Sequence, residues 1–243
     1  MSLDVLKFSN TVLIAPLIAV LSIWTVFWVE VQFSVNLNEY GVYPRTVSGL
    51  KGIVFSPFIH GSVSHLYNNT IPLAVLMAFL FYFYQDVALR VLLFGTLVSG
   101  LLTWAIARPS YHIGASGVIY LLASFIFFKG IFAKNYRLVA LSLIVVFIYG
   151  SMVWYIFPVK DGISWEGHLS GFATGLVFAF ITKVRVPEVR KYDWEREDYR
   201  EEDDPFLQHF DEDGNFIETS SEESEESEDQ IEIKYHYRKS TEE

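Results

Sequence analysis

The chain contains no cysteine among its 243 residues. It therefore forms no disulfide, holds no metal through thiolates and uses no cysteine nucleophile, although this absence leaves the redox compartment open. Ionisable residues are also scarce over most of the chain: residues 1–187 hold 6 acidic and 11 basic residues, whereas residues 188–243 hold 22 acidic and 7 basic ones. The sequence thus predicts two domains, a weakly basic, apolar core over 1–187 and an acidic tail over 188–243.

Polar faces are missing from six apolar runs of about 20 residues each. About 20 helical residues cross the roughly 30 Å hydrocarbon layer of a bilayer, so these runs predict six membrane spans and exclude a soluble helical protein. The first run is too long for a signal-peptide core and has no small-residue cleavage site, so we expect it to stay in the protein. The runs cover residues 11–31, 66–85, 88–107, 114–132, 138–157 and 165–182.

The distribution of Lys and Arg near the span ends predicts the orientation of the protein. With the N-terminus in the cytoplasm, nine of these residues lie on the cytoplasmic side and four on the outer side. This excess favours both termini in the cytoplasm. We expect an integral multi-pass protein of a bacterial cell (inner) membrane, whose longest connection, residues 32–65, folds against the outer leaflet.

Few polar side chains interrupt the spans. The functional candidates among them are His65 and Asn69 at the start of the second span, Ser116 in the fourth and His168 in the sixth. Charged groups at the bilayer centre cost about 2.5–3.5 kcal/mol, so ionisable residues there are functional candidates. At 1.5 Å rise per residue, all four lie about 10 Å below the outer surface. Three helices therefore bring polar groups to one depth.

Each of these residues also has a purely structural interpretation. An isolated intramembrane serine such as Ser116 usually packs as a small residue or bonds its own helix, and His168 could bond a neighbouring helix. Gly171 and Gly175 form a stripe of small residues that lets the sixth span approach another helix closely. If that helix is the fourth span near Gly117, the imidazole comes within hydrogen-bond reach of the serine.

Three motifs, in this order, resemble those of the rhomboid family of intramembrane serine proteases. "HGSVSHLYNN" matches the family's HxxxxHxxxN pattern, "GASGVIY" matches its GxSG motif with a tyrosine one turn later, and "GHLSGFATG" matches HxxGxxxG. The resemblance covers about residues 35–182. It implies an all-α membrane protein, a six-transmembrane-helix bundle of rhomboid type.

The resemblance also implies a role for each motif residue. Ser116 and His168 would form a catalytic dyad, while His65, Asn69 and the backbone N–H of Ser116 would stabilise the transition state. Tyr120 would pack against the histidine ring. Glycines would support the dyad from both sides: Gly114, Gly117, Gly171 and Gly175.

The residues themselves make this chemistry reasonable. A serine hydroxyl becomes a good nucleophile when a base takes its proton, and neutral imidazole is a suitable base. We expect no acid to orient His168, because Glu166 lies two residues back on another helix face. Tyr43-Pro44-Arg45 stands where many family members have a Trp-Arg pair, which leaves open how the first outer loop is anchored. His112 is expected to be an exposed loop residue.

The sequence therefore predicts a serine endopeptidase that cleaves transmembrane protein substrates near the outer face. Its partners would be these substrates and the lipid bilayer, with no nucleic acid, cofactor or metal; His60, His65 and His168 lack a carboxylate or thiolate to complete a zinc site. One alternative is a proteolytically inactive rhomboid-like protein that binds transmembrane clients. Another is a transporter, which should place polar residues at several depths.

The acidic tail carries three recognisable segments. "TSSEESEESEDQ" is a low-complexity run, so we expect a largely disordered tail. "DEDGN" predicts a turn rather than a calcium loop, because its glycine is fourth rather than sixth. "QIEIKYHYRK" alternates apolar and polar residues and could pair with the sheet edge of a protein partner.

Overall fold

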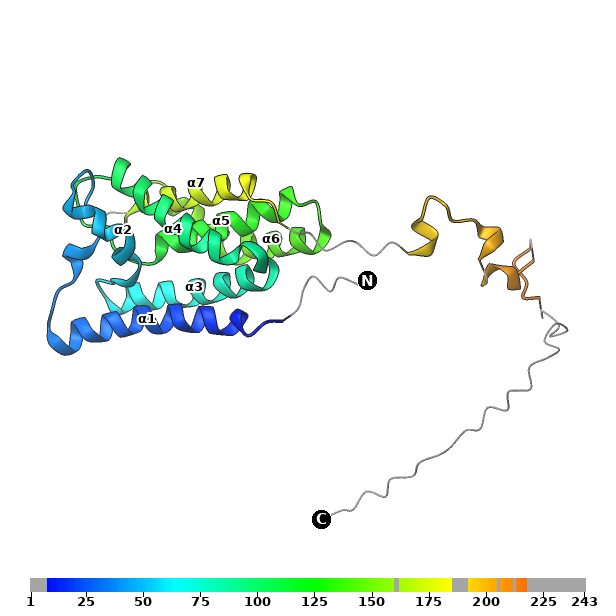
Figure 1. Ribbon diagram of the computed structural model, residues 1–243, viewed down its shortest axis with the longest axis horizontal. Helices are drawn as coiled ribbons and strands as arrows, with labels where there is room; N and C mark the ends of the chain where they lie inside the picture. The colour runs from blue at the N-terminus through cyan, green and yellow to red at the C-terminus, as the bar shows by residue number, and fades with distance from the viewer. Residues whose placement is uncertain (1–7, 160–161, 185–191, 205, 212, 218–243) are drawn as a thin grey trace, which may run out of the picture. The chain divides into compact units, whose positions relative to one another are not determined.

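The computed structural model describes residues 8–159, 162–184, 192–204, 206–211 and 213–217 (Figure 1). Within these residues the regular structure is helical, and the β-pairing found is two isolated bridges. The prediction of an all-helical protein is therefore confirmed for the described part of the chain. The chain divides into two compact units, Met1–Val189 and Arg190–Glu243.

The described part of the first unit contains seven α-helices. In Figure 1, α1 and α3 run side by side along one side of the bundle, α7 lies on the opposite side, and α5 lies between them. After α6, the chain continues as a 3-10 helix, Gly150–Ile156. The α-helices are α1 (Thr11–Phe33), α2 (Gly52–Phe55), α3 (Val63–Phe83), α4 (Gln85–Ile106), α5 (Ser116–Phe132), α6 (Tyr136–Tyr149) and α7 (Trp165–Ile181).

Each of the six apolar runs in the sequence corresponds to one of the long helices. Four segments are long and apolar enough to cross a membrane: α1, α3, α4, and α6 together with its 3-10 extension, Tyr136–Ile156. The helices α5 and α7 have 17 residues each, which gives about 25 Å at 1.5 Å per residue. The fourth run was predicted to begin at about residue 114, and its helix begins at Ser116.

Side-chain caps fix where three of these helices begin. Ser62 accepts a hydrogen bond from the backbone N–H of His65 at the start of α3, and Ser164 accepts one from Gly167 at the start of α7. Asn135 caps α6 through the N–H groups of Arg137 and Leu138. Such caps satisfy N–H groups that have no partner in the first helical turn.

The core of the first unit is built around α5, which packs against α3, α4, α6 and α7. Its central residues Leu121, Leu122 and Phe125 are completely buried. Near the C-terminal end of α5, the Nζ of Lys129 donates to the carbonyl oxygens of Ala179 (3.1 Å) and Thr182 at the C-terminal end of α7. A cation there complements the partial negative charge of the helix terminus.

Glycines allow α5 and α7 to approach each other closely. A Cβ atom added to Gly171 would overlap the carbonyl oxygen of Gly117, and one added to Gly175 would overlap that of Leu121. The stripe of small residues in α7 therefore faces α5, as required for the two helices to bring Ser116 and His168 together.

The connection between α1 and α3 is folded and anchored to the end of α4. It contains α2 and three short 3-10 helices, Asn38–Tyr40, Ser48–Lys51 and Ser56–Phe58. The Arg45 guanidinium donates to the carbonyl oxygens of Ala105 (3.2 Å) and Ala107 (2.8 Å). In return, Trp104 Nε1 donates to the carbonyl oxygen of Thr46 at 2.8 Å. An arginine and a tryptophan thus anchor this loop, the tryptophan coming from α4.

The described residues of the second unit form short 3-10 helices, Asp193–Glu195, Glu201–Asp203 and Leu207–His209. Phe210 and Phe216 pair as an isolated bridge, and Asp211 Oδ1 accepts hydrogen bonds from the backbone N–H groups of Asp213 and Asn215. The "DEDGN" segment therefore makes a turn, as predicted. The acidic run and "QIEIKYHYRK" lie outside the described residues.

Candidate active site

The polar residues singled out in the sequence lie near the beginnings of three helices. Ser116 is the first residue of α5, His168 the fourth of α7, and His65 the third of α3. Ser116, His168, His65, Asn69 and Tyr120 all line one cavity of about 830 Å³. This volume is within the range of small-molecule and substrate sites. The cavity also brings together residues that are up to 103 positions apart in the chain.

The ring of His168 is held by two contacts. It stacks on Tyr120, with the ring centroids 4.3 Å apart and the planes at 13°. Its Nδ1 lies 2.9 Å from the carbonyl oxygen of Tyr155, in the 3-10 helix after α6. Because a carbonyl oxygen only accepts hydrogen bonds, Nδ1 must carry the hydrogen. In the neutral ring, Nε2 then keeps its lone pair and can take a proton.

This arrangement explains how the ring is oriented without an acid. The carboxylate of Glu166 pairs with Arg108, its Oε1 lying 3.6 Å from Arg108 Nε, so it does not bond His168. The Tyr155 carbonyl instead fixes the tautomer of His168, the task of the acid in a catalytic triad. The sequence offered no signal for this group, because every residue has a backbone carbonyl.

Ser116 begins α5 and lies between two cavities. As the first residue of the helix, its backbone N–H has no i−4 carbonyl to bond, and no other hydrogen bond among the described residues uses it. Among the same residues, no hydrogen bond joins the Ser116 hydroxyl to His168. Catalytic hydrogen bonds are often long in a protein without substrate and shorten when the substrate binds.

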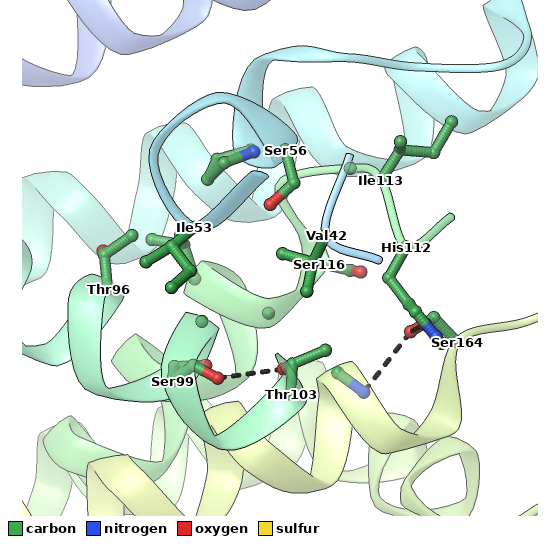
Figure 2. Close-up of a pocket in the computed structure, with 16 residues that line it drawn as sticks. Val42, Ile53, Ser56, Thr96, Ser99, Thr103, His112, Ile113, Ser116 and Ser164 are labelled. Atoms are coloured by element: carbon green, nitrogen blue, oxygen red, sulfur yellow. Dashed lines mark hydrogen bonds between the residues drawn. The ribbon is translucent and has the colours of Figure 1, made fainter. Parts of the chain in front are cut away.

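The second cavity lies behind Ser116 and is much smaller, about 40 Å³ (Figure 2). Figure 2 shows Ser99 and Thr103 of α4 around it, together with His112 from the segment before α5 and Ser164, which caps α7. Its volume is large enough for water, and its hydroxyl groups offer hydrogen-bond partners. Gly114 and Gly117 also line this cavity.

His65 and Asn69 approach the serine motif from α3. The Asn69 side-chain amide donates one hydrogen to the carbonyl oxygen of His65 at 3.1 Å, which leaves its second hydrogen available. Gly114 has a φ angle of +107°, and a Cβ atom there would lie 2.6 Å from His65 Nε2 and 3.7 Å from Asn69 Nδ2. A glycine at 114 is therefore needed both for its backbone conformation and for the approach of the His65 ring, whereas the distance to Asn69 is an ordinary van der Waals contact.

His60 supports the serine motif from the segment before α3. Its Nε2 accepts a hydrogen bond from the backbone N–H of Ala115 at 3.4 Å, and its Nδ1 lies 3.3 Å from the carbonyl oxygen of Phe58. Burial lowers the pKa of His60 to about 4, and the nearby His65 also lowers it, while the hydrogen bond to Phe58 acts in the opposite direction. The neutral ring is therefore a structural support.

The prediction that His112 is an exposed loop residue is wrong. Only 5% of its surface is exposed, and its ring nitrogens bond Ser164 and the carbonyl oxygen of Arg108. The sequence places His112 in a short polar connection, and this composition gave no indication that other loops cover it. No group of three or more His, Cys, Asp or Glu side chains suited to a metal occurs among the described residues.

Comparison with known proteins identifies the family. A model described as "Rhomboid domain" matches residues 48–185, more than half of the chain. The protein therefore belongs to the rhomboid family, and with its apolar helices it is an integral membrane protein.

Relatives are found in mycobacteria. Uncharacterized proteins from Mycobacterium tuberculosis and Mycobacterium leprae are 36% and 34% identical to this chain over 160 residues. The match covers 60% of this chain and 65% and 61% of these relatives, so it spans less than two thirds of their length. Their names assign no activity.

Proposed function

We propose that this protein is an intramembrane serine endopeptidase that cleaves transmembrane protein substrates with a dyad of Ser116 and His168. The observation that carries the proposal is the orientation of His168. Its Nδ1 hydrogen is donated to the Tyr155 carbonyl, its face is stacked on Tyr120, and His168 and Ser116 line the same cavity. A base with one free nitrogen beside a serine is the minimum needed for nucleophilic catalysis.

In the first half of the reaction, His168 Nε2 takes the hydroxyl proton of Ser116 as the serine oxygen attacks the scissile carbonyl carbon. The carbonyl oxygen becomes an oxyanion. When this intermediate collapses, the carbon–nitrogen bond breaks, the leaving amine takes the proton from His168, and an acyl-enzyme remains. In the second half, His168 takes a proton from water, hydroxide attacks the acyl carbon, and Ser116 regains its hydrogen.

Three donors are available for the oxyanion. The backbone N–H of Ser116 is at a helix N-terminus, where the partial positive charge of the helix adds to the stabilisation. The other two are His65 and the second hydrogen of the Asn69 amide, both close to Gly114. Donors that are fixed before the reaction lower the barrier because they need no reorganisation.

The arrangement in the membrane is part of the same proposal. All six long helices span the bilayer, with both termini in the cytoplasm of a bacterial cell, and α3, α5 and α7 run from the outer face inwards. Ser116, sixteen residues from the inner end of α5, is then about 24 Å above that end, in the outer part of the bilayer. Residues 1–187 form the protease core, and residues 188–243 form a largely disordered cytoplasmic tail with a possible protein partner.

This depth limits the substrates. A transmembrane helix engages its carbonyl groups in i→i−4 hydrogen bonds, so a serine can attack only where the helix opens. We therefore expect cleavage in the outer third of the substrate's span, at small residues beside helix-weakening Gly or Pro. No cofactor or metal is required for this chemistry.

The proposal is tested by reaction with a fluorophosphonate, which modifies serines activated by a base. Wild-type protein in detergent should be labelled on Ser116, the Ser116→Ala variant should not be labelled, and His168→Ala should react far more slowly. Equal labelling of wild type and Ser116→Ala would overturn the dyad. The same outcome would favour an inactive relative that binds transmembrane clients.

A further inference from the structure

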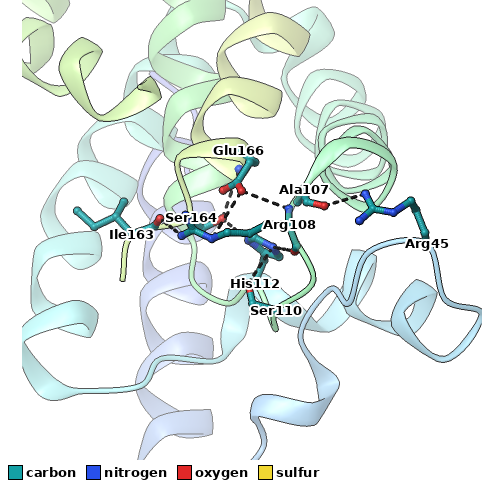
Figure 3. Close-up of polar contacts among 9 residues, drawn as sticks. Arg45, Ala107, Arg108, Ser110, His112, Ile163, Ser164 and Glu166 are labelled. Atoms are coloured by element: carbon teal, nitrogen blue, oxygen red, sulfur yellow. Dashed lines mark hydrogen bonds and ion pairs between the residues drawn. The ribbon is translucent and has the colours of Figure 1, made fainter. Parts of the chain in front are cut away.

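A set of polar side chains connects the segment before Ser116 to the beginning of α7 (Figure 3). We call this set the joint; its members are Arg108, His112, Ser164 and Glu166. His112 Nδ1 lies 2.6 Å from the hydroxyl oxygen of Ser164, and His112 Nε2 lies 3.0 Å from the carbonyl oxygen of Arg108. Since the carbonyl only accepts, Nε2 carries the hydrogen, and Nδ1 accepts the hydroxyl hydrogen of Ser164. Ser110 Oγ also lies 3.3 Å from Nε2.

The backbone of His112 ties the joint to the first outer loop. Its N–H donates to the carbonyl oxygen of Val42 at 2.9 Å, and its own carbonyl accepts from the Val42 N–H at 3.0 Å. The rings of Tyr43 and Tyr111 meet beside this bridge, with centroids 4.9 Å apart. One buried residue therefore joins three segments: the loop after α1, the segment before α5, and the segment before α7.

An ion pair forms the second connection of the joint. Arg108 lies with Nε 3.6 Å from Glu166 Oε1, its backbone N–H donates to the same oxygen at 3.2 Å, and its Nη2 donates to the carbonyl oxygen of Ile163 at 2.6 Å. The Glu166 side chain is 3% exposed and the Arg108 side chain 44%. A buried carboxylate is costly without its partner, so this contact resists separation of the two segments.

His112 and Ser164 of the joint each lie four residues before a member of the proposed dyad, Ser116 and His168 respectively. Ser164 also caps α7 by accepting from the N–H of Gly167, so the His112 ring contacts the residue that sets where α7 begins. A displacement of about 1 Å between reacting groups can lower a rate about 100-fold.

We propose that His112 is a positioning residue that sets the place of Ser116 relative to His168 through its hydrogen bond with Ser164. This inference rests on the proposed function. His112 does not act as a second base: both of its ring nitrogens are engaged, and it lines the small cavity behind Ser116 rather than the large one. Arg108 and Glu166 hold the same two segments together.

The test is a double-mutant cycle on the rate of fluorophosphonate labelling, measured well below the unfolding temperature. His112→Phe keeps a planar ring but removes the ring-nitrogen bonds to Ser164 and to the Arg108 carbonyl, and it should slow labelling about tenfold. Ser164→Ala should slow it at least as much. Because both changes remove the bond between His112 and Ser164, the slowing in the double variant should be clearly less than the product of the two single effects. Ser164→Thr, which keeps the hydroxyl, should restore labelling to near the wild-type rate.

Controls separate positioning from a loss of folding. Ser110→Ala removes a hydroxyl that contacts the same ring but not α7, so its labelling should stay within about twofold of wild type. On a cleavable substrate, His112→Phe should lower kcat and leave KM nearly unchanged. Multiplicative slowing in the double variant, or wild-type labelling of His112→Phe, would overturn the role of His112.

Hydrogen exchange gives a reading that does not depend on activity. In His112→Phe, amides of residues 108–117 and 162–170 should exchange faster together, while those in the middle of α4 should not change. Unchanged exchange over 162–170 would contradict the joint even if the wild-type protein were not labelled. Absence of labelling in the wild type with the expected exchange would instead count against the proposed protease function.

Discussion

The imidazole ring of His168 and the phenol ring of Tyr120 are stacked, and both are hydrogen-bonded to the 3-10 helix that follows α6. His168 Nδ1 donates to the carbonyl oxygen of Tyr155 at 2.9 Å, and the Tyr120 hydroxyl donates to that of Met152 at 2.7 Å. Long 3-10 segments are uncommon and often mark hinges. The orientation of the proposed base therefore depends on the conformation of residues 150–156.

Substitutions at Tyr120 should separate the two contributions of this residue. Tyr120→Phe keeps the stacked ring and loses one hydrogen bond, so we expect a loss of up to about tenfold in kcat. Tyr120→Leu also removes the aromatic surface, worth about 0.5–1.5 kcal/mol, and frees the His168 ring to rotate. The loss in kcat should therefore be clearly larger in Tyr120→Leu than in Tyr120→Phe. Turnover of a transmembrane substrate, compared with the unfolding temperature, measures both effects; equal turnover of the two variants would contradict the role of stacking.

The proposed oxyanion donors predict a second pattern. Removing one fixed donor typically costs about 2.7–4 kcal/mol, or about 100- to 1000-fold in kcat. His65→Ala and Asn69→Ala should each show a loss of this size with KM little changed. Tyr67→Ala is a suitable control, because this side chain lies in the same turn of α3 but is 57% exposed. If both variants keep wild-type kcat, the two side chains have another role.

Much of this site could be predicted from the sequence because its residues are marked by type and spacing. His65 and Asn69 recur at i and i+4 on one helix, Ser116 lies between glycines, and His168 precedes its own glycine stripe. Helical rise then predicts a common depth for them in the membrane. Residue type, spacing and helical rise are each properties of a single segment, so they can be read directly from the sequence.

The contacts between segments could not be predicted in the same way. The Tyr155 carbonyl that orients His168 has no sequence signature, and the 3-10 form of residues 150–156 is not distinguishable from an α-helix by its apolar composition. The burial of His112 depends on the loop around Val42, some 70 residues away. Likewise, Arg45 bonds the carbonyl oxygens of Ala105 and Ala107 only because the end of α4 lies beside the first loop.

The close approach of α5 and α7 predicts the effect of a single methyl group. Gly→Ala usually stabilises a helix, but a Cβ at Gly171 would overlap the carbonyl oxygen of Gly117. Gly171→Ala should therefore cost about 1–3 kcal/mol. Gly150→Ala is the matched control, since its Cβ would lie at an ordinary 3.4 Å from Val146 Cγ1. The unfolding temperature in detergent should fall only in Gly171→Ala; an equal effect of both would count against tight helix packing.

His60 predicts how stability depends on pH. Its pKa of about 4 in the folded protein lies below the ordinary value of 6.5, so the unfolded chain binds more protons between these values. Stability should therefore decrease as the pH falls from 6.5 towards 4, by at most about 1.4 kcal/mol per pH unit for this group. His60→Asn should be less stable at pH 7.5 but lose less on acidification. Unfolding temperatures between pH 7.5 and 5 measure the difference, and parallel curves would refute it.

The central claim is that Ser116 and His168 cut a transmembrane helix in the outer part of the bilayer. It is tested most directly with the purified protein in lipid vesicles and one reporter span whose Gly-Pro pair is moved stepwise from its outer to its inner end, with products mapped by mass spectrometry. The account predicts cuts near the outer end that fade as the weak point moves inwards, and none with Ser116→Ala. Efficient cutting near the cytoplasmic end, or cutting by Ser116→Ala, would contradict it.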